Sequence, residues 1–219
     1  MKDGESCADI ATGECLKLFE DLKLVKVLVL GKENVGKTTL VKRIIGEWKI
    51  GNRLNSFIFG ADTRIPTDGI EMKQWKPEGM KNTVIYFWDF AGQELYYATH
   101  HFFLSQNSIN IIVFDCTKSL EENRLLFWLN SIQSLGPGSS ILMVGSFTDQ
   151  LKDKNEIRII SENIDRLITS WQDSIPFSQR PKLFRCQWNG ISVSFYPLNC
   201  TRSKIKLESF YSRYCSYIY

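Results

Sequence analysis

The sequence predicts an α/β fold in which a mostly parallel sheet is covered by helices on both faces. Three continuous apolar runs are typical of strands buried on both sides, and amphipathic segments with helical spacing follow them. Strands that alternate with helices favour parallel βαβ units with right-handed crossovers. Two further runs joined by a turn-forming segment indicate a hairpin, which adds one antiparallel edge strand. We therefore expect a sheet of about six strands.

The expected elements follow one another along the chain. Apolar, mostly β-branched residues predict strands in LVKVLVL, INIIVFD and SILMVGS, and the recurrence of Leu125, Trp128 and Ile132 predicts a helix. Pro77 and Gly79 supply the turn of the hairpin. Strands are expected over 24–30, 69–75, 83–89, 109–115, 140–146 and 192–199, helices over 37–47, 119–135, 155–171 and 204–214, and loops over 48–66 and 173–190. The last loop is expected to pack its own aromatic side chains, with a partner surface as the alternative.

Composition limits the classes of function. The chain has 219 residues and a net charge of only +3, which argues against nucleic acid or an acidic membrane as its main partner. The six cysteines are scattered without a CxxC pair, as expected of reduced thiols. No apolar run approaches the length of a membrane span, so we expect a cytoplasmic protein without direct membrane insertion. Residues 1–22 are a polar N-terminal extension before one domain over 23–219, and the end at Tyr219 suggests a piece of a longer protein.

The segment GKENVGKT, residues 31–38, connects the first predicted strand to the first predicted helix. Gly31, Gly36, Lys37 and Thr38 fit the phosphate-binding pattern GxxxxGK[ST]. Glycines let successive backbone N–H groups turn towards phosphate oxygens, and the N-terminus of the following helix points its positive dipole end at the same anion. Lys37 would then meet the β- and γ-phosphates, and the Thr38 hydroxyl would bind Mg²⁺. A chance match in an unrelated turn is the alternative.

Two other segments carry residues suited to phosphate hydrolysis. Asp89 ends the strand over 83–89, where it can hold a Mg²⁺-bound water. The Gly92 N–H can bond a γ-phosphate, and Gln93 can orient the attacking water. Thr67, in the loop before the hairpin, can bind Mg²⁺ through its hydroxyl and the γ-phosphate through its N–H. Ordinary turn residues are the alternative for each, and T-x-G is weak by itself.

Together GKENVGKT, TDGI and WDFAGQELYYATHHFF resemble the Ras-like GTPase superfamily, and most closely the Roc domain of ROCO proteins, the group that contains the leucine-rich-repeat kinases. The resemblance extends over about residues 22–217. It implies a three-layer P-loop GTPase fold, binding of GTP and GDP with Mg²⁺, and slow GTP hydrolysis as a signalling switch within a larger multidomain protein. It also implies an adjacent COR-type domain and a homodimer as partners.

The resemblance also assigns the expected site. The nucleotide-binding residues would be Gly31, Glu33, Asn34, Val35, Gly36, Lys37, Thr38, Thr39, Asp89, Gly92, Ser146, Phe147, Asp149, Asn199 and Cys200. The catalytic residues would be Gln93, Lys37 and Thr67. The Mg²⁺ site would consist of Thr38, Thr67 and, through a water molecule, Asp89.

The expected base-binding segments depart from the usual family pattern. The guanine motif [NT]-[KH]-x-D is replaced by Ser146-Phe147-Thr148-Asp149, in which Asp149 can accept from the guanine N1–H and amino group together. Phe147 can cover the base by stacking, and the stretch beginning at Asn199-Cys200 can present a backbone N–H to guanine O6. Glu33 lies where many relatives have a small residue, and we expect it to point to solvent and hydrolysis to be slow. A nucleotide-inert interaction module and an ATP-using enzyme are the alternatives.

Overall fold

A computed structural model describes residues 23–46, 69–77, 82–91, 108–153, 155–188 and 190–198. Five of the expected site residues lie outside these ranges: Thr67, Gly92, Gln93, Asn199 and Cys200. The loop expected over 48–66 and the helix expected over 204–214 also lie outside them. Among the described residues, no helix combines the length and the apolar character that crossing a bilayer requires.

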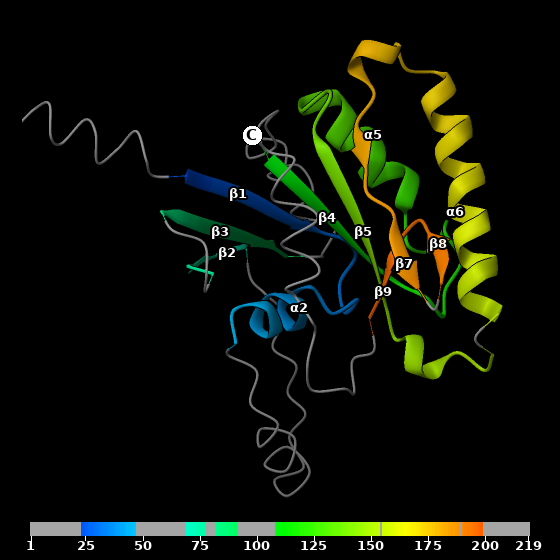
Figure 1. The fold of residues 1–219 in the computed structure, drawn as a ribbon, viewed down its shortest axis with the longest axis horizontal. Coiled ribbons are helices and arrows are strands. Elements are labelled where there is room, and N and C mark those ends of the chain that lie inside the picture. Colours follow the sequence, from blue (N-terminus) through cyan, green and yellow to red (C-terminus); the bar gives the residue numbers. More distant parts are fainter. Residues whose placement is uncertain are drawn as a thin grey trace, which may run out of the picture.

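A seven-stranded sheet forms the centre of the fold, with the strand order β2-β3-β1-β4-β5-β6 and β9 also paired to β5 (Figure 1). Its strands are β1 (Lys23–Leu30), β2 (Ile70–Trp75), β3 (Thr83–Phe90), β4 (Ser108–Asp115), β5 (Ser140–Ser146), β6 (Lys182–Leu183) and β9 (Tyr196–Pro197). Every pairing in the sheet is parallel except that of β2 with β3. The predicted mixed sheet with an antiparallel hairpin at its edge is therefore confirmed.

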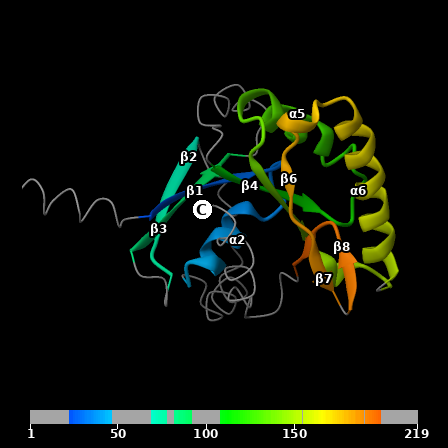
Figure 2. The same ribbon diagram turned by 45° about the horizontal axis from the view of Figure 1, so that its top comes forward.

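Helices cover both faces of this sheet. Helix α2 (Lys37–Ile44) lies on one side, and α5 (Leu125–Leu135) and α6 (Asn155–Asp173) lie on the other (Figure 2). The helix predicted from residue 119 begins only at Leu125, because Arg124 adopts a left-handed backbone conformation with φ 54°. Residues before it form a separate turn, in which Ser119 and Glu122 exchange side-chain-to-backbone hydrogen bonds of 2.9 and 3.1 Å.

Two predictions at the C-terminal end of the described chain were wrong in detail. The strand expected over 192–199 divides between β9, in the main sheet, and β8 (Ile191–Val193), which pairs antiparallel with β7 (Cys186–Trp188) in a second sheet. The expected loop over 173–190 contains the 3₁₀ turn η3 (Phe177–Gln179), β6 of the main sheet and β7 of the second sheet. Phe177 in this segment is 86% exposed rather than packed against other aromatic side chains.

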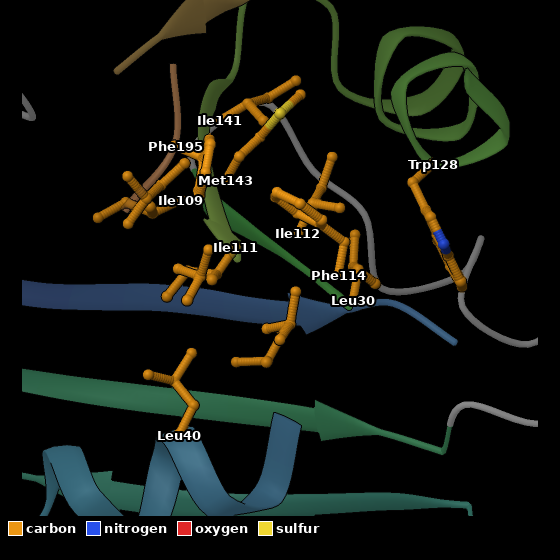
Figure 3. Packing of buried hydrophobic residues seen from close by; sticks show 14 of the residues in the cluster. Leu30, Leu40, Ile109, Ile111, Ile112, Phe114, Trp128, Ile141, Met143 and Phe195 are labelled. Atoms are coloured by element: carbon orange, nitrogen blue, oxygen red, sulfur yellow. The ribbon is translucent and has the colours of Figure 1, made fainter. Parts of the chain in front are cut away.

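The hydrophobic core lies between the central strands and the two helix layers. All eight residues of β4 are buried, which explains its continuous apolar sequence. Leu40 of α2 packs on one side of the sheet and Trp128 of α5 on the other, with Leu30 and Ile112 among the buried side chains between them (Figure 3). Each large apolar side chain that is fully buried contributes about 1.5–3 kcal/mol of transfer free energy. This two-sided burial fixes the sheet on which the loops at the strand ends are built.

A tight contact near the end of β5 gives the first testable prediction. An added Cβ at Gly145 would lie 2.4 Å from Cys116 Sγ and 2.7 Å from the Phe195 ring. We expect Gly145→Ala to lower the free energy of unfolding by about 1–3 kcal/mol, because overpacking displaces both side chains. Urea titration measures the change, and Ser134→Ala at an exposed position of α5 is the control, with almost no loss expected. Equal stability of the two variants would contradict the prediction.

Candidate functional site

The loop between β1 and α2 forms a tight turn at the carboxyl edge of the sheet. Gly31 and Gly36 have φ values of 140° and 94°, and Asn34 has φ 61°. At Gly31 a Cβ would also lie only 2.2 Å from the Val113 carbonyl oxygen, so β1 and β4 leave no room for a side chain. Gly36 caps α2 in a left-handed conformation, which a glycine adopts without a steric penalty. The glycines of the motif are thus required by the backbone path.

Lys37 is held inside this turn. Its side chain is 6% exposed, and its Nζ donates hydrogen bonds to the carbonyl oxygens of Gly31 (2.9 Å) and Lys32 (2.6 Å). Burial lowers the pKa of Lys37 to about 8, while the nearby carboxylates of Asp89 and Glu33 limit the decrease. The amine is therefore still mostly protonated at pH 7, and its positive charge lies within the turn.

Asp89 from the end of β3 meets the first turn of α2. The Thr38 hydroxyl donates to Asp89 Oδ2 at 2.5 Å, and the Asp89 side chain is fully buried. Burial raises the pKa of Asp89 to about 6, although the Thr38 hydrogen bond and the Lys37 charge act in the opposite direction. Asp89 Oδ1 has no hydrogen-bond partner among the described residues. The Thr38 hydroxyl and the Asp89 carboxylate, whose Oδ1 has no described partner, are oxygen ligands of the kind that suit Mg²⁺.

The remaining residues of the expected phosphate site differ in exposure. Val35 is buried, Thr39 is half-buried, and Glu33 and Asn34 are exposed. Exposure of Glu33 agrees with the expectation that its carboxylate points to solvent. A charge held there has weaker electrostatic influence on a bound anion than a buried charge would have.

The expected base-binding turn follows β5 at the same edge of the sheet. Ser146 is fully buried and its hydroxyl donates to the Phe114 carbonyl oxygen at 2.9 Å. Phe147 has φ 57° and is half-buried, and the 3₁₀ turn η2 (Thr148–Gln150) follows it. Asp149 is exposed. Ser146 therefore uses its hydroxyl within the sheet, whereas Phe147 and Asp149, also predicted to contact a base, are partly or fully exposed.

A hydrogen-bonded group at the end of β4 was missed by sequence reasoning. Asp115 Oδ1 accepts from the Thr117 N–H (2.9 Å) and hydroxyl (2.6 Å), and the Asn123 side chain bonds both the N–H (2.8 Å) and the C=O (2.9 Å) of Asp115. Asp115 pairs in register with Ser146 across β4 and β5. The group therefore fixes the edge between the two candidate loops. Its sequence signal is an Asp at a strand end, followed two residues later by Thr.

The structure brings three parts of the predicted site to one edge of the sheet. The 31–38 turn follows β1, Asp89 lies near the end of β3, and the 146–149 turn begins at the last residue of β5. Parallel strands present their carboxyl ends on the same side of the sheet. Thr38 and Asp89 are in direct contact.

Comparison with known proteins identifies the family. A sequence model described as "Ras of Complex, Roc, domain of DAPkinase" matches residues 26–149, more than half of the chain. The chain belongs to the Roc family. Its fold is accordingly the P-loop GTPase fold of that family, as the sequence predicted.

Curated relatives of this chain are considerably longer than the chain itself. "Probable serine/threonine-protein kinase pats1" of Dictyostelium discoideum is 34% identical in an alignment 155 residues long that covers 63% of this chain and 5% of the relative. "Leucine-rich repeat serine/threonine-protein kinase 1" of Caenorhabditis elegans is 29% identical in an alignment 171 residues long that covers 69% of this chain and 6% of the relative. The chain thus spans a small part of these relatives.

A solved structure extends the Roc comparison to three dimensions. The Methanosarcina barkeri Roco2 RocCORdC structure, described as bound to GDP, aligns with a TM-score of 0.56 and 28% sequence identity. The alignment covers 90% of this chain and 49% of that chain. The Roc similarity therefore reaches beyond the segment that the family sequence model matches.

The buried Asp89 carboxyl gives a pH-dependent prediction for the nucleotide-free protein. Its pKa is raised from 3.8 to about 6 in the folded chain, so the folded state retains a proton between these values that the unfolded state loses. The wild type should therefore lose stability relative to Asp89→Asn as the pH rises from 4 to 6, by about 1–3 kcal/mol in total. Denaturant titrations of both proteins between pH 4 and 7 measure the difference. A wild type that gains stability over the variant in this range would contradict the assigned shift.

Proposed function

We propose that this Roc domain is a guanine-nucleotide switch that binds GTP and GDP with Mg²⁺ and slowly hydrolyses GTP. The observation that carries the proposal is the buried Lys37 amine within the Gly31–Thr38 turn, next to the Thr38–Asp89 contact. A buried cation in a glycine-containing turn at a helix N-terminus favours a polyphosphate ligand. The family match and the GDP bound to Roco2 support the choice of guanine nucleotide.

The proposed phosphate-binding groups are the Lys37 amine and the backbone of the turn that holds it. An ammonium group has three N–H donors, and Lys37 gives two to backbone carbonyls of the turn, which leaves a third for a phosphate oxygen. The proposed cradle comprises Gly31, Glu33, Asn34, Val35, Gly36, Lys37, Thr38 and Thr39, with Glu33 and Asn34 contributing their backbone. The two carbonyl bonds hold the amine in place before the ligand arrives, so less conformational freedom is lost on binding.

Thr38 and Asp89 fit a Mg²⁺ site, because a hydroxyl and a buried carboxylate oxygen without a described partner lie together there. We propose that Thr38 binds the ion directly, Asp89 binds through water, and Thr67 completes the set. Bound Mg²⁺ would supply positive charge at the phosphate oxygens. Asp89 must be ionised for this role, and with a pKa of about 6 it is mostly ionised at pH 7.

For the base, we propose that Asp149 accepts hydrogen bonds from guanine N1–H and the amino group while Phe147 covers the ring. Asp149 is exposed at the carboxyl edge, where its carboxylate is accessible to a ligand. Ser146 would contribute by holding the turn, since its hydroxyl is bonded to Phe114. Asn199 and Cys200 lie outside the described residues and are proposed to present a backbone N–H to guanine O6.

Hydrolysis would depend on positioning and charge neutralisation. Gln93 would orient the attacking water and the Gly92 N–H would bond the γ-phosphate; both lie outside the described residues. Without an arginine supplied by a partner, we expect a turnover on the order of 10⁻⁴ to 10⁻² s⁻¹. The segments around Thr67 and Gln93 would change order with the γ-phosphate, which is the switch.

The proposed context is a larger cytoplasmic signalling protein. Roc-containing relatives are many times longer than this chain, and the Roco2 structure contains a RocCOR unit. We propose a COR-type neighbour, a homodimer, and a domain over residues 23–219 preceded by an extension over 1–22.

One observation favours a second candidate, an interaction module that does not respond to nucleotide. Phe147 stands at the position where the guanine motif [NT]-[KH]-x-D has lysine or histidine, and the Ser146 hydroxyl is bonded within the sheet. Calorimetric titration with GDP, GTPγS, ADP and ATP distinguishes the two. Our proposal requires binding of GDP and GTPγS in preference to the adenine nucleotides. No heat and no thermal shift at millimolar nucleotide would support the second candidate, and a preference for ATP would refute the assignment of Asp149.

Removal of the Lys37 amine tests the phosphate cradle. We expect Lys37→Ala to weaken GDP and GTPγS binding by at least about 100-fold, because a desolvated cation no longer meets the phosphates. Circular dichroism should show an intact fold, since truncation also removes a buried charge. Lys42→Ala on the same helix is the matched control and should bind as the wild type does. Unchanged affinity in Lys37→Ala would refute the assigned cradle.

A further inference from the structure

We propose that a polar clamp formed by Asp165, Arg185 and Ser194 positions the base-binding turn 146–149 and so tunes discrimination between purine bases. The inference rests on the proposed function, because it concerns regulation of that same site by residues remote from it. None of the three touches the turn directly among the described contacts, so they are positioning residues.

The clamp joins α6 to the β7–β8 hairpin. Arg185 donates to both carboxylate oxygens of Asp165, with Nη1···Oδ1 2.6 Å and Nη2···Oδ2 3.1 Å, and the Ser194 hydroxyl donates to Oδ1 at 2.5 Å. Arg185 Nε also donates to the Ser192 hydroxyl at 3.1 Å. Burial raises the pKa of Asp165, but the hydrogen bonds from Arg185 and Ser194 outweigh it and hold the pKa below its ordinary value. One carboxylate thus holds the beginning of β7 and the end of β8.

A second contact fixes the backbone at the same point. The Ser194 N–H donates to the Ser161 hydroxyl at 2.9 Å, and both serines are buried. Ser161 and Asp165 are four residues apart, so they lie on one face of α6. The helix therefore holds Ser194 through its main chain and its side chain, which defines both the position and the direction of the chain that leaves β8.

That chain runs directly into β9, which supports the end of β5. Strand β9 begins two residues after Ser194 and pairs with β5 at Val144↔Tyr196 and Gly145↔Pro197. The Leu198 N–H then donates to the Gly145 carbonyl oxygen at 2.7 Å. A two-residue strand has few ladder hydrogen bonds, and Pro197 has no N–H to add, so β9 depends on contacts outside the ladder.

Phe195 packs into the hydrophobic core beside the turn and so links the clamp to the end of β5. Its ring meets Phe114 edge to face at 5.2 Å between centroids and lies directly over Gly145. The Phe114 carbonyl oxygen accepts the Ser146 hydroxyl bond, and Ser146 opens the base-binding turn. A shift of Ser194 would therefore move Phe195 and β9 together and displace the support under Ser146 and, three residues later, Asp149.

The size of the effect is limited by the exposure of the clamp. The Arg185 and Asp165 side chains are 50% and 37% exposed, and exposed ion pairs contribute about 0–1 kcal/mol to stability. Variants of the clamp should therefore fold, and their effect on ligand affinity should amount to a few-fold change. The bidentate geometry matters more than the charge, because a lysine cannot reproduce two parallel hydrogen bonds.

The experiment compares Asp165→Asn, Arg185→Lys and a control, Glu162→Gln. Glu162 is on the same helix, pairs with Arg158 at 3.5 Å, and gives the same change of charge as Asp165→Asn. Three ligands are titrated by calorimetry: GDP, inosine diphosphate, which lacks the amino group that Asp149 would recognise, and pyrophosphate, which reports on the cradle alone. Hydrogen exchange of the Leu198 amide reports on β9 without any ligand.

We expect both clamp variants to bind GDP about three- to ten-fold more weakly, with a similar fall in the GDP-to-inosine-diphosphate affinity ratio. Pyrophosphate affinity should stay within two-fold of the wild type, Leu198 exchange should accelerate, and Glu162→Gln should behave as the wild type. An unchanged ratio of GDP affinity to inosine-diphosphate affinity in the clamp variants would overturn the proposed positioning role. An equal loss of GDP and pyrophosphate binding would overturn it as well. Failure of the wild type to bind guanine nucleotide would refute the proposed function. If the wild type binds but the clamp variants bind as it does, only the proposed role of the clamp is refuted.

Discussion

The parallel pairing of β1 with β3 and β4 is the constraint on which the site depends. It sets Val29 opposite Asp89 and Leu30 opposite Ile112, so the turn that begins at Gly31 emerges between two strand ends. A shift of one residue would reverse the faces of the side chains on β1 and separate the turn from Asp89. Most of β1 and all of β4 are buried, so packing on both faces holds these strands where the turn emerges. Stability of the core and placement of the site are thus consequences of the same hydrophobic pattern.

The site places charge where burial opposes it. Lys37 and Asp89 are both removed from water, and burial moves the pKa of each towards the neutral form. Their mutual attraction reduces this effect without cancelling it. Such groups destabilise the folded chain slightly until a ligand of suitable charge satisfies them, which is typical of binding sites as opposed to structural ion pairs. A polyphosphate with Mg²⁺ would meet both needs, since it offers negative charge to Lys37 and positive charge to Asp89.

The second half of the site is supported differently. The proposed base-binding turn has no buried charge; Ser146 is held by its hydrogen bond to Phe114, and β9 pairs with the end of β5. Strand β9 follows the β7–β8 hairpin, which polar contacts fasten to α6. The phosphate cradle is therefore built into the core, whereas the base-binding turn depends on a peripheral extension. We therefore propose that sequence changes in that extension alter base recognition with little effect on the proposed cradle.

Much of the fold, and the position of the candidate phosphate-binding turn, could be predicted from the sequence by itself. Continuous apolar runs predicted β1, β4 and β5, because strands buried on both faces must be apolar along their length. Gly31, Gly36, Lys37 and Thr38 predicted the cradle, since a glycine-rich turn before a helix has few other uses. Local sequence signals failed to predict element boundaries that depend on an unusual backbone conformation or on a distant contact. Arg124 delays the start of α5 by adopting a left-handed conformation that its residue type does not indicate, and the segment 192–199 divides between two sheets.

Only the tertiary structure decided what the strand ends meet. That the Thr38 hydroxyl reaches Asp89, 51 residues further along the chain, depends on sheet order, which no local pattern contains. The Asp165–Arg185 pair and the packing of Phe195 over Gly145 likewise join residues through folding. The sequence determined which residues could carry phosphate chemistry, because their types and spacing have local causes. Their arrangement around one site is a property of long-range packing, in which many weak contacts act together.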